Sequence, residues 1–120
     1  MKSVWLKVIA VEIAFAKRAL RQLCESERTA RRSLGHAIAE RLKRRLADLR
    51  AAKCVTDLVA GRPKEIQSTQ PGRMVIDLGE GFQLIFCANH DQAPLTNGLR
   101  VDWSKVNRVK ILSIASDHVR

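Results

Sequence analysis

The feature that most constrains the fold of this chain is a change of hydrophobic period between its two halves. Before residue 52, apolar residues recur three or four positions apart, as in the series Leu34, Ile38, Leu42, Leu46 and Leu49. Such spacing places their side chains on one face of a helix. After residue 73 the apolar residues occur in short runs rich in β-branched side chains, which favour strands. The sequence therefore predicts an α+β fold, with helices first and a mainly antiparallel sheet after them.

The first half also contains the expected start of the sheet. A β-branched run predicts a strand near residues 8–14, and residues 1–7 either begin this strand or precede it as an extension. Helices are expected near 16–25 and 28–51, with Ser26 as the N-cap of the second. Gly35 falls inside that second helix. A glycine there lowers helix stability by about 1 kcal/mol relative to alanine, and close approach of another backbone is one reason for a glycine at such a position.

The second half predicts a hairpin and a closing strand. Two apolar runs within 74–86 flank the turn Gly79-Glu80-Gly81, which is typical of a short β-hairpin. The last strand is expected near 106–115, and the proline- and glycine-containing stretches between these elements are expected to be loops. With 120 residues, the chain has the length of a single domain.

The chain is strongly basic, and the excess charge is concentrated in the predicted helices. The formal net charge is +10 and the isoelectric point is near 10.4. Between Lys17 and Lys53 there are twelve basic and four acidic residues, a net charge of +8. This distribution favours a polyanionic partner, either a nucleic acid or an acidic protein. The alternative is a solvated helical face that serves solubility alone.

Cysteine and histidine positions argue against a metal centre. Cys24, Cys54 and Cys87 are far apart and show no paired ligand spacing, which favours a reduced cytoplasmic compartment. His36 and His90 also lack partners at metal-ligand spacing, so no metal or cofactor is expected. The apolar segment 4–16 is interrupted by charge and is too short to span a bilayer, so no membrane association is expected.

Several segments together resemble a known family. They are residues 30–35, 41–50, 58–63, 82–86, 102–106 and 111–114. In order and spacing, across about residues 8–118, the chain resembles the RelE/ParE superfamily of small bacterial toxins, and within it the HigB-like plasmid-maintenance killer proteins. The resemblance implies a β-α-α-β-β-β fold in which a small sheet packs against an N-terminal helical hairpin. It also implies a ribosome-dependent mRNA endoribonuclease in the bacterial cytoplasm, whose partner is a helix-turn-helix antitoxin.

The implied reaction is attack of an RNA 2′-hydroxyl group on the adjacent 3′-phosphate. It requires a base for the hydroxyl, cations for the developing phosphorane charge, and an acid for the leaving 5′-oxygen. The resemblance carries these roles to His118 for proton transfer and to Lys64 and Arg73 for phosphate charge. Arg62 and Asp117 are implied secondary contacts, and Asp117 would orient His118.

Two family positions differ in this chain. Gln83 stands where the returning strand of the hairpin usually carries an arginine, and the C-terminal Ser116-Asp117-His118 replaces an Asp-Tyr-His pattern. The chain has no tyrosine. Arg41, Arg44 and Arg45 on the basic helix are candidate contacts to RNA or to the antitoxin.

Each candidate residue also has an ordinary interpretation. The loop cations and His118 are the kind of residue that commonly lies on a protein surface, and Asp117 is expected to be solvated. Trp5 and Trp103 would stack on a base in a binding site, but a tryptophan in so small a domain is more often part of the core. Three functions therefore compete: an mRNA-cleaving toxin, a degenerate toxin that binds antitoxin or RNA without cleavage, and a ParE-like gyrase inhibitor.

Overall fold

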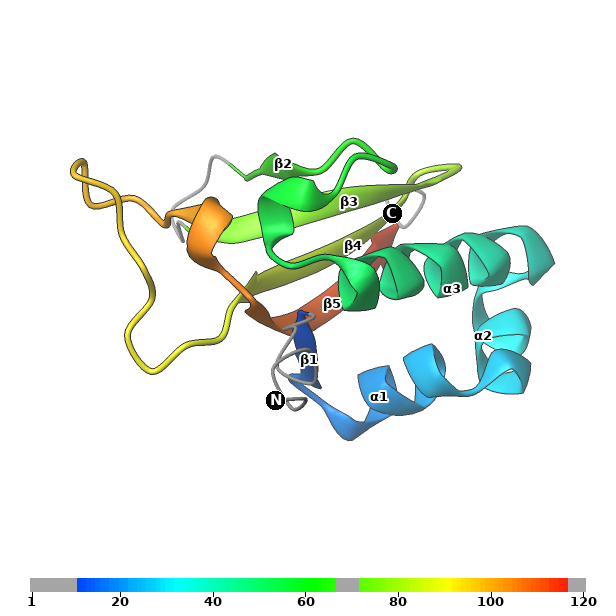
Figure 1. Cartoon of the computed structure of the whole chain (residues 1–120). Coiled ribbons are helices and arrows are strands. Elements are labelled where there is room, and N and C mark those ends of the chain that lie inside the picture. Colours follow the sequence, from blue (N-terminus) through cyan, green and yellow to red (C-terminus); the bar gives the residue numbers. More distant parts are fainter. Residues whose placement is uncertain (1–10, 67–71, 117–120) are drawn as a thin grey trace, which may run out of the picture.

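The computed structural model describes residues 11–66 and 72–116, which form a five-stranded sheet with its helices packed on one face (Figure 1). Across the sheet the strand order is β1 (Glu12–Phe15), β5 (Arg108–Ser116), β4 (Phe82–Ala88), β3 (Arg73–Gly79) and β2 (Lys64–Glu65). The β1–β5 pair is parallel and the other three pairs are antiparallel. The predicted α+β fold with a mainly antiparallel sheet is confirmed.

The helical layer consists of α1 (Arg18–Glu25), α2 (Glu27–Leu34) and α3 (His36–Ala51). Ser26 separates α1 from α2, and its side-chain oxygen accepts a hydrogen bond from the backbone N–H of Thr29 at 3.2 Å. The predicted N-cap is thus confirmed, because this bond satisfies a backbone donor that has no partner within the helix.

The prediction of one continuous helix over 28–51 is wrong, because the helix breaks at Gly35. This glycine has φ 85° and ψ 162°, a backbone region that is essentially restricted to glycine. A Cβ atom added there would meet no atom within 4 Å. Backbone conformation, rather than the close approach of another segment, therefore requires the glycine. The break separates α2 from α3 and allows the two helices to take different directions (Figure 1).

The core lies between α3 and the central strands. Ile38, Leu42, Leu46 and Leu49 of α3 are buried, as the helical spacing predicts, and they belong to one cluster with residues of β3, β4 and β5. Burial of each such side chain contributes about 1.5–3 kcal/mol to stability. Trp103 also belongs to this cluster, and its ring meets that of Phe86 edge-on at 6.1 Å between centroids. The core interpretation of this tryptophan is confirmed, whereas Trp5 lies outside the described residues.

The hairpin is confirmed; its turn pairs Gly79 with Phe82, and an irregularity between Asp77 and Gly79 shifts the register of the remaining pairs. Glu80 and Gly81 both have positive φ, 53° and 83°, which is the requirement of a two-residue type I′ turn. The final strand begins at Arg108, two residues later than predicted, and the described part of the first strand is Glu12–Phe15. The short strand β2 was not predicted; it lies in a stretch expected to be a loop and forms one edge of the sheet.

The break at Gly35 generates a stability prediction. Replacing Gly35 by alanine should lower the free energy of unfolding by about 1–3 kcal/mol, because a residue with a Cβ atom is strained at this backbone conformation. Equilibrium denaturation followed by circular dichroism measures the change. Gly98→Ala is the matched control: a Cβ there lies 3.8 Å from the Thr96 hydroxyl, so stability should stay within about 0.5 kcal/mol. Equal stability of the Gly35 variant and the wild type would contradict this account of the break.

Candidate nucleic-acid interface

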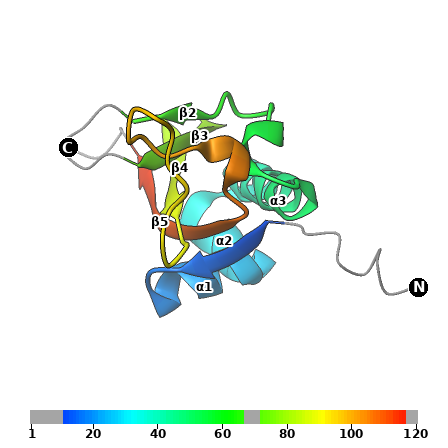
Figure 2. The same cartoon turned by 60° about the vertical axis from the view of Figure 1, so that its left-hand side comes forward.

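The sheet has one face covered by helices and one face that the helices leave open (Figure 2). Along β3, Met74, Ile76 and Leu78 are buried in the core cluster. Successive side chains of a strand point to opposite faces. The other face therefore carries the alternate residues of β3 and β4, and we call it the open face; they are Arg73, Val75, Asp77, Gln83, Ile85 and Cys87.

The open face holds a cleft at its β2 side, which we call the β2–β4 cleft. It has a volume of about 240 Å³ and is lined by Arg62, Lys64, Val75, Asp77 and Gln83. The sheet register explains the grouping, since Lys64 is opposite Val75 and Asp77 is opposite Gln83. Three residues predicted from the sequence, Arg62, Lys64 and Gln83, are thus brought together over a buried Val75.

Arg62 is held in this cleft by an unusual backbone turn. Gly61 and Arg62 both have positive φ, 83° and 50°, and the carbonyl of Gly61 accepts a hydrogen bond from the N–H of Asp77 at 2.8 Å. A side chain at Gly61 would overlap the Ile76 methyl group. The glycine therefore lets the loop lie against β3, which puts Arg62 beside the strand.

Asp77 is the anionic group of the cleft. One carboxylate oxygen accepts a hydrogen bond from the Gly79 N–H at 3.0 Å, and the other accepts one from the Arg62 guanidinium at 3.1 Å. The backbone bond first, and then the Arg62 contact, lowers the pKa of Asp77 below its usual range. Arg62 is therefore partly neutralised, and the cleft has a fixed carboxylate beside its cations.

Lys64 and Arg73 supply positive charge on the same face. Lys64 is exposed and Arg73 is half-buried. In the part of the chain that the structure describes, neither takes part in a salt bridge. Gln83 is exposed and contributes a neutral amide where the resemblance places an arginine. Two cations and an amide donor are groups that bind a phosphate.

The basic helix is divided between structural and free arginines. The Arg41 guanidinium donates to the carbonyl of Leu78 at 3.1 Å. The Arg45 side chain is only 18% exposed, and its guanidinium pairs with Asp48 at 3.0 Å. Arg44 is exposed, and no salt bridge among the described residues involves it. Their predicted role in binding stays a prediction, with Arg44 as the member that is free of such contacts.

Two further site predictions concern the C-terminal residues, and two residues of the cleft were not predicted. His118 and Asp117 lie outside the described residues, so their roles stay predictions. Sequence reasoning missed Val75 and Asp77 as part of the cleft. A two-residue turn at Glu80 and Gly81 would place Asp77 opposite Leu84, but an irregularity between Asp77 and Gly79 shifts the register and pairs Asp77 with Gln83. The turn residues alone therefore gave no signal for this pairing.

Residues 11–66 and 72–116 contain no group of three or more His, Cys, Asp or Glu side chains placed to hold a metal ion. Over the same residues, no helix combines the length and the apolar character needed to cross a bilayer.

Comparison with solved structures shows which fold this is. The YoeB/ParE toxin from Agrobacterium tumefaciens superposes with a TM-score of 0.56 at 5% identity, over 88% of this chain and 96% of that one. The YoeB dimer from Staphylococcus aureus superposes with a TM-score of 0.53 at 13% identity, over 86% of this chain and 92% of that one. The YoeB–YefM complex from the same organism gives a TM-score of 0.54 at 12% identity, over 87% of this chain and 93% of that one. The chain has the fold of the YoeB/ParE toxins.

The sequence comparisons add nothing to this likeness. No family model matches the chain, and no curated protein does. The YoeB/ParE fold confirms the superfamily architecture predicted from the sequence, while the HigB-like branch stays a prediction. At these low identities the fold carries over to this chain, and function requires a separate argument from the open face.

The depressed pKa of Asp77 generates a pH prediction. A carboxyl whose pKa is lower in the folded state stabilises the fold at pH values above its unfolded pKa of about 3.9, and this contribution is lost as the pH falls through the folded-state pKa. Wild type should therefore be more stable than Asp77→Asn at pH 7, and the difference should shrink toward pH 2. Denaturation at both pH values measures it, with Glu40→Gln as a control that changes charge elsewhere. A difference that is the same at both pH values would contradict the assignment.

Proposed function

We propose that this chain is the toxin of a toxin–antitoxin pair of the YoeB/ParE type and acts as a ribosome-dependent mRNA endoribonuclease. The observation that carries the proposal is the β2–β4 cleft, which gathers Lys64, Arg62 and Gln83 on the open face of a YoeB/ParE fold. These are positions to which the sequence resemblance assigned phosphate contacts.

The stabilisation of phosphate charge and one of the two proton transfers are assigned to residues. Lys64 and Arg73 stabilise the negative charge that develops on the phosphate as the 2′-hydroxyl attacks. His118 transfers the proton, because a histidine is poised to do so near neutral pH. Asp117 is assigned a contact to the RNA, and Arg62, already paired with Asp77, contacts the RNA from the cleft rim. A 2′-hydroxyl nucleophile restricts the substrate to RNA.

The partner is proposed from charge. The helical layer carries most of the net positive charge, and such a surface attracts an acidic protein segment. YoeB from Staphylococcus aureus has been solved as a complex with YefM. By analogy, we assign to this chain a helix-turn-helix antitoxin, as expected for the HigB-like branch, and a cytoplasmic site of action on ribosome-bound mRNA.

One observation favours a second candidate. Gln83 places a neutral amide in the cleft where a cation would stabilise the phosphorane. A chain without that charge retains a surface that binds RNA or antitoxin and loses catalytic power. The alternative is therefore a degenerate toxin that binds without cleavage. If the chain binds no RNA, inhibition of DNA gyrase, which is the ParE-like activity, is the function to measure next.

The first test measures cleavage. Purified protein is added to translating ribosomes, and cuts in the mRNA are mapped by primer extension. Wild type should cut, and His118→Ala, Lys64→Gln and Arg73→Gln should each lower the rate, by about 10²–10⁴-fold for a general acid–base group. Arg28→Gln, a matched loss of charge on the exposed surface of α2, should cut at the wild-type rate.

The outcomes separate the candidate functions. Equal rates for wild type and His118→Ala would remove His118 from the mechanism. Binding of mRNA without cleavage would establish the degenerate toxin, and Gln83→Arg with Asp117→Tyr should then raise activity. Absence of both RNA binding and cleavage would overturn the nuclease proposal and leave gyrase inhibition to be measured by supercoiling.

The second test concerns the basic helix and its partner. Arg44 is exposed and takes part in no salt bridge among the described residues. Arg44→Gln should therefore weaken antitoxin or ribosome binding and leave the free energy of unfolding unchanged. It should also reduce the dependence of binding affinity on salt. Arg41→Gln should lower the free energy of unfolding by about 1 kcal/mol, because it removes the bond to Leu78. Calorimetric titration and denaturation measure the two effects. Unchanged binding by Arg44→Gln and by the triple variant with Arg41 and Arg45 would show that this face is only solvated.

A further inference from the structure

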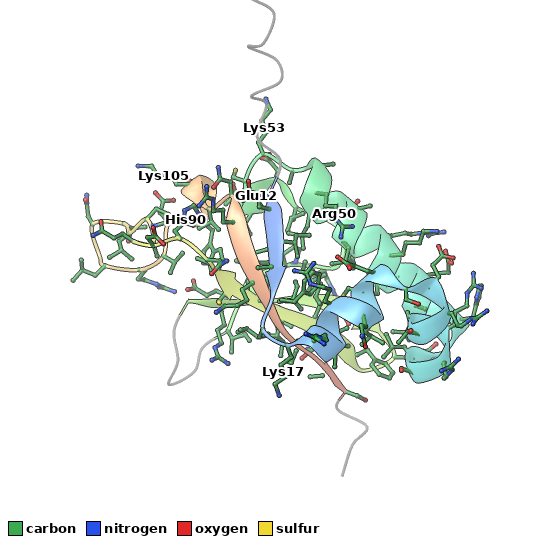
Figure 3. The ribbon with its side chains drawn as sticks, turned by 90° about the horizontal axis from the view of Figure 1, so that it is seen from below. Glu12, Lys17, Arg50, Lys53, His90 and Lys105 are labelled. Carbon is green, nitrogen blue, oxygen red and sulfur yellow. The ribbon has the colours of Figure 1, made fainter. Side chains whose placement is uncertain are left out.

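A second cleft lies at the opposite edge of the sheet, next to the edge strand β1. It has a volume of about 300 Å³ and is lined by Glu12, Ile13, Ala14, Asn89, His90, Asp91 and Arg108. Figure 3 shows His90 on the side of β1 that faces away from the helices. The cleft shares no residue with the β2–β4 cleft, and β5 lies between β1 and β4. It is therefore a separate site, with a volume at the low end of small-molecule pockets.

The wall of this cleft formed by residues 89–91 is held in place by two backbone contacts with the start of β5. The N–H of Asn89 donates to the carbonyl of Arg108 at 2.7 Å. The Nε2 atom of His90 accepts a hydrogen bond from the N–H of Asn107 at 3.3 Å. This bond holds the His90 ring against the segment that leads into β5.

The charged groups of the cleft are one guanidinium and two carboxylates. Glu12 and Arg108 are cross-strand neighbours, and the Nε of Arg108 lies 3.5 Å from a Glu12 carboxylate oxygen. Both side chains are more than half exposed, at 70% for Glu12 and 57% for Arg108. Asp91 is exposed and takes part in no salt bridge among the described residues. The cleft therefore presents planar donors and planar acceptors that remain accessible from solvent.

This combination selects one nucleobase. A guanidinium binds the adjacent acceptors O6 and N7 of guanine with two hydrogen bonds. A carboxylate accepts from the adjacent donors N1–H and N2–H of the same base, on an edge that is exposed only in unpaired nucleotides. Adenine lacks the carbonyl acceptor beside N7, and uracil has no two adjacent acceptors. Cytosine has the adjacent acceptors O2 and N3, but it offers a carboxylate only its N4 amino group instead of two adjacent donors. A cleft with Arg108 beside Asp91 and Glu12 therefore fits guanine better than the other bases.

A cation on the open face connects the two clefts. Lys110 of β5 pairs with Cys87 of β4 on one side and with Ala14 of β1 on the other, and Cys87 pairs with Arg73 of β3. The Cα atoms of Arg73 and Lys110 are therefore two strand spacings apart, about 10 Å. Lys110 takes part in no salt bridge among the described residues. An RNA backbone leaving the β2–β4 cleft past Arg73 would meet Lys110 beside the second cleft.

We propose that the cleft formed by Glu12, His90, Asp91 and Arg108 binds a guanine base, and that the base belongs to an unpaired nucleotide of an RNA lying across the open face. The RNA part rests on the proposed function. A free guanine nucleotide presents the same base, so the experiment distinguishes the two sources. Arg108 binds the O6 and N7 atoms, the carboxylates accept from N1 and N2, and Lys110 contacts the neighbouring phosphate.

The experiment has a free-nucleotide arm and an RNA arm. Guanosine monophosphate and adenosine monophosphate are titrated into the full chain, and NMR signals of residues 12 and 89–91 are followed. Short uridine-rich oligonucleotides with one central guanosine or adenosine are compared by fluorescence anisotropy, with 2′-O-methyl groups to prevent cleavage. The guanosine oligonucleotide should bind about fivefold or more tightly than the adenosine one. Guanosine monophosphate, but not adenosine monophosphate, should shift the signals.

Variants of the cleft residues test whether the preference for guanosine arises at this cleft. Asp91→Asn and Arg108→Gln should abolish the preference for guanosine, while the charge-matched controls Glu40→Gln and Arg28→Gln on the helices should keep it. Lys110→Gln should weaken both oligonucleotides equally and leave the preference unchanged. A wild type that binds both oligonucleotides equally, or an Asp91→Asn variant that keeps the preference, would overturn the guanine site while leaving the cleavage proposal intact. Signal shifts with guanosine monophosphate but no oligonucleotide binding would assign the site to a free nucleotide and count against the RNA function.

Discussion

The packing of α3 against the central strands is the interaction on which the rest of the structure depends. Leu42, Leu46 and Leu49 are almost completely buried against a cluster that includes Ile76, Leu84 and Phe86. This contact uses one face of β3 and β4 entirely for the core. Because a strand alternates its side chains, the opposite face of the same strands is left for polar and charged residues. The open face, with its clefts, is a consequence of where the helix binds.

Glycines and a few arginines connect α3 to the strands and loops of the open face. Gly61 lets the loop before β2 lie against β3, and Gly79 leaves the space that the Arg41 guanidinium occupies. The Cδ atom of the Arg45 side chain also lies close to Gly61. These contacts position Arg62, and through it Asp77, at the rim of the β2–β4 cleft. The basic helix thus has two roles: part of its charge holds the sheet loops, and part remains available to a partner.

The two clefts give the open face different chemical characters. At the β2 side, the cleft contains the cations Arg62 and Lys64, and Asp77 pairs with Arg62. At the β1 side, two carboxylates face the single guanidinium of Arg108, and the guanine recognition proposed there depends on the pattern of hydrogen-bond donors and acceptors. A face with both characters is suited to a ligand that has an anionic backbone and unpaired bases. The fold shared with the YoeB/ParE toxins places these clefts on a scaffold of known type.

The sequence by itself determined the elements whose signals are local. The leucine spacing of α3, the Ser26 cap and the turn at Glu80 and Gly81 depend on neighbouring residues, and each was predicted. The break at Gly35 and the strand β2 were not, because a glycine in a helical pattern and a two-residue edge strand acquire their structure from tertiary packing. For the same reason, the sequence identified Lys64 and Gln83 only as separate residues. Their grouping with Asp77 in one cleft depends on the register of the sheet. The cleft of Glu12, His90 and Arg108 joins three segments that are distant in the sequence. The parallel pairing of β1 with β5 places Glu12 beside Arg108, and the bonds of residues 89 and 90 to residues 107 and 108 add His90, so only the tertiary structure decides this grouping.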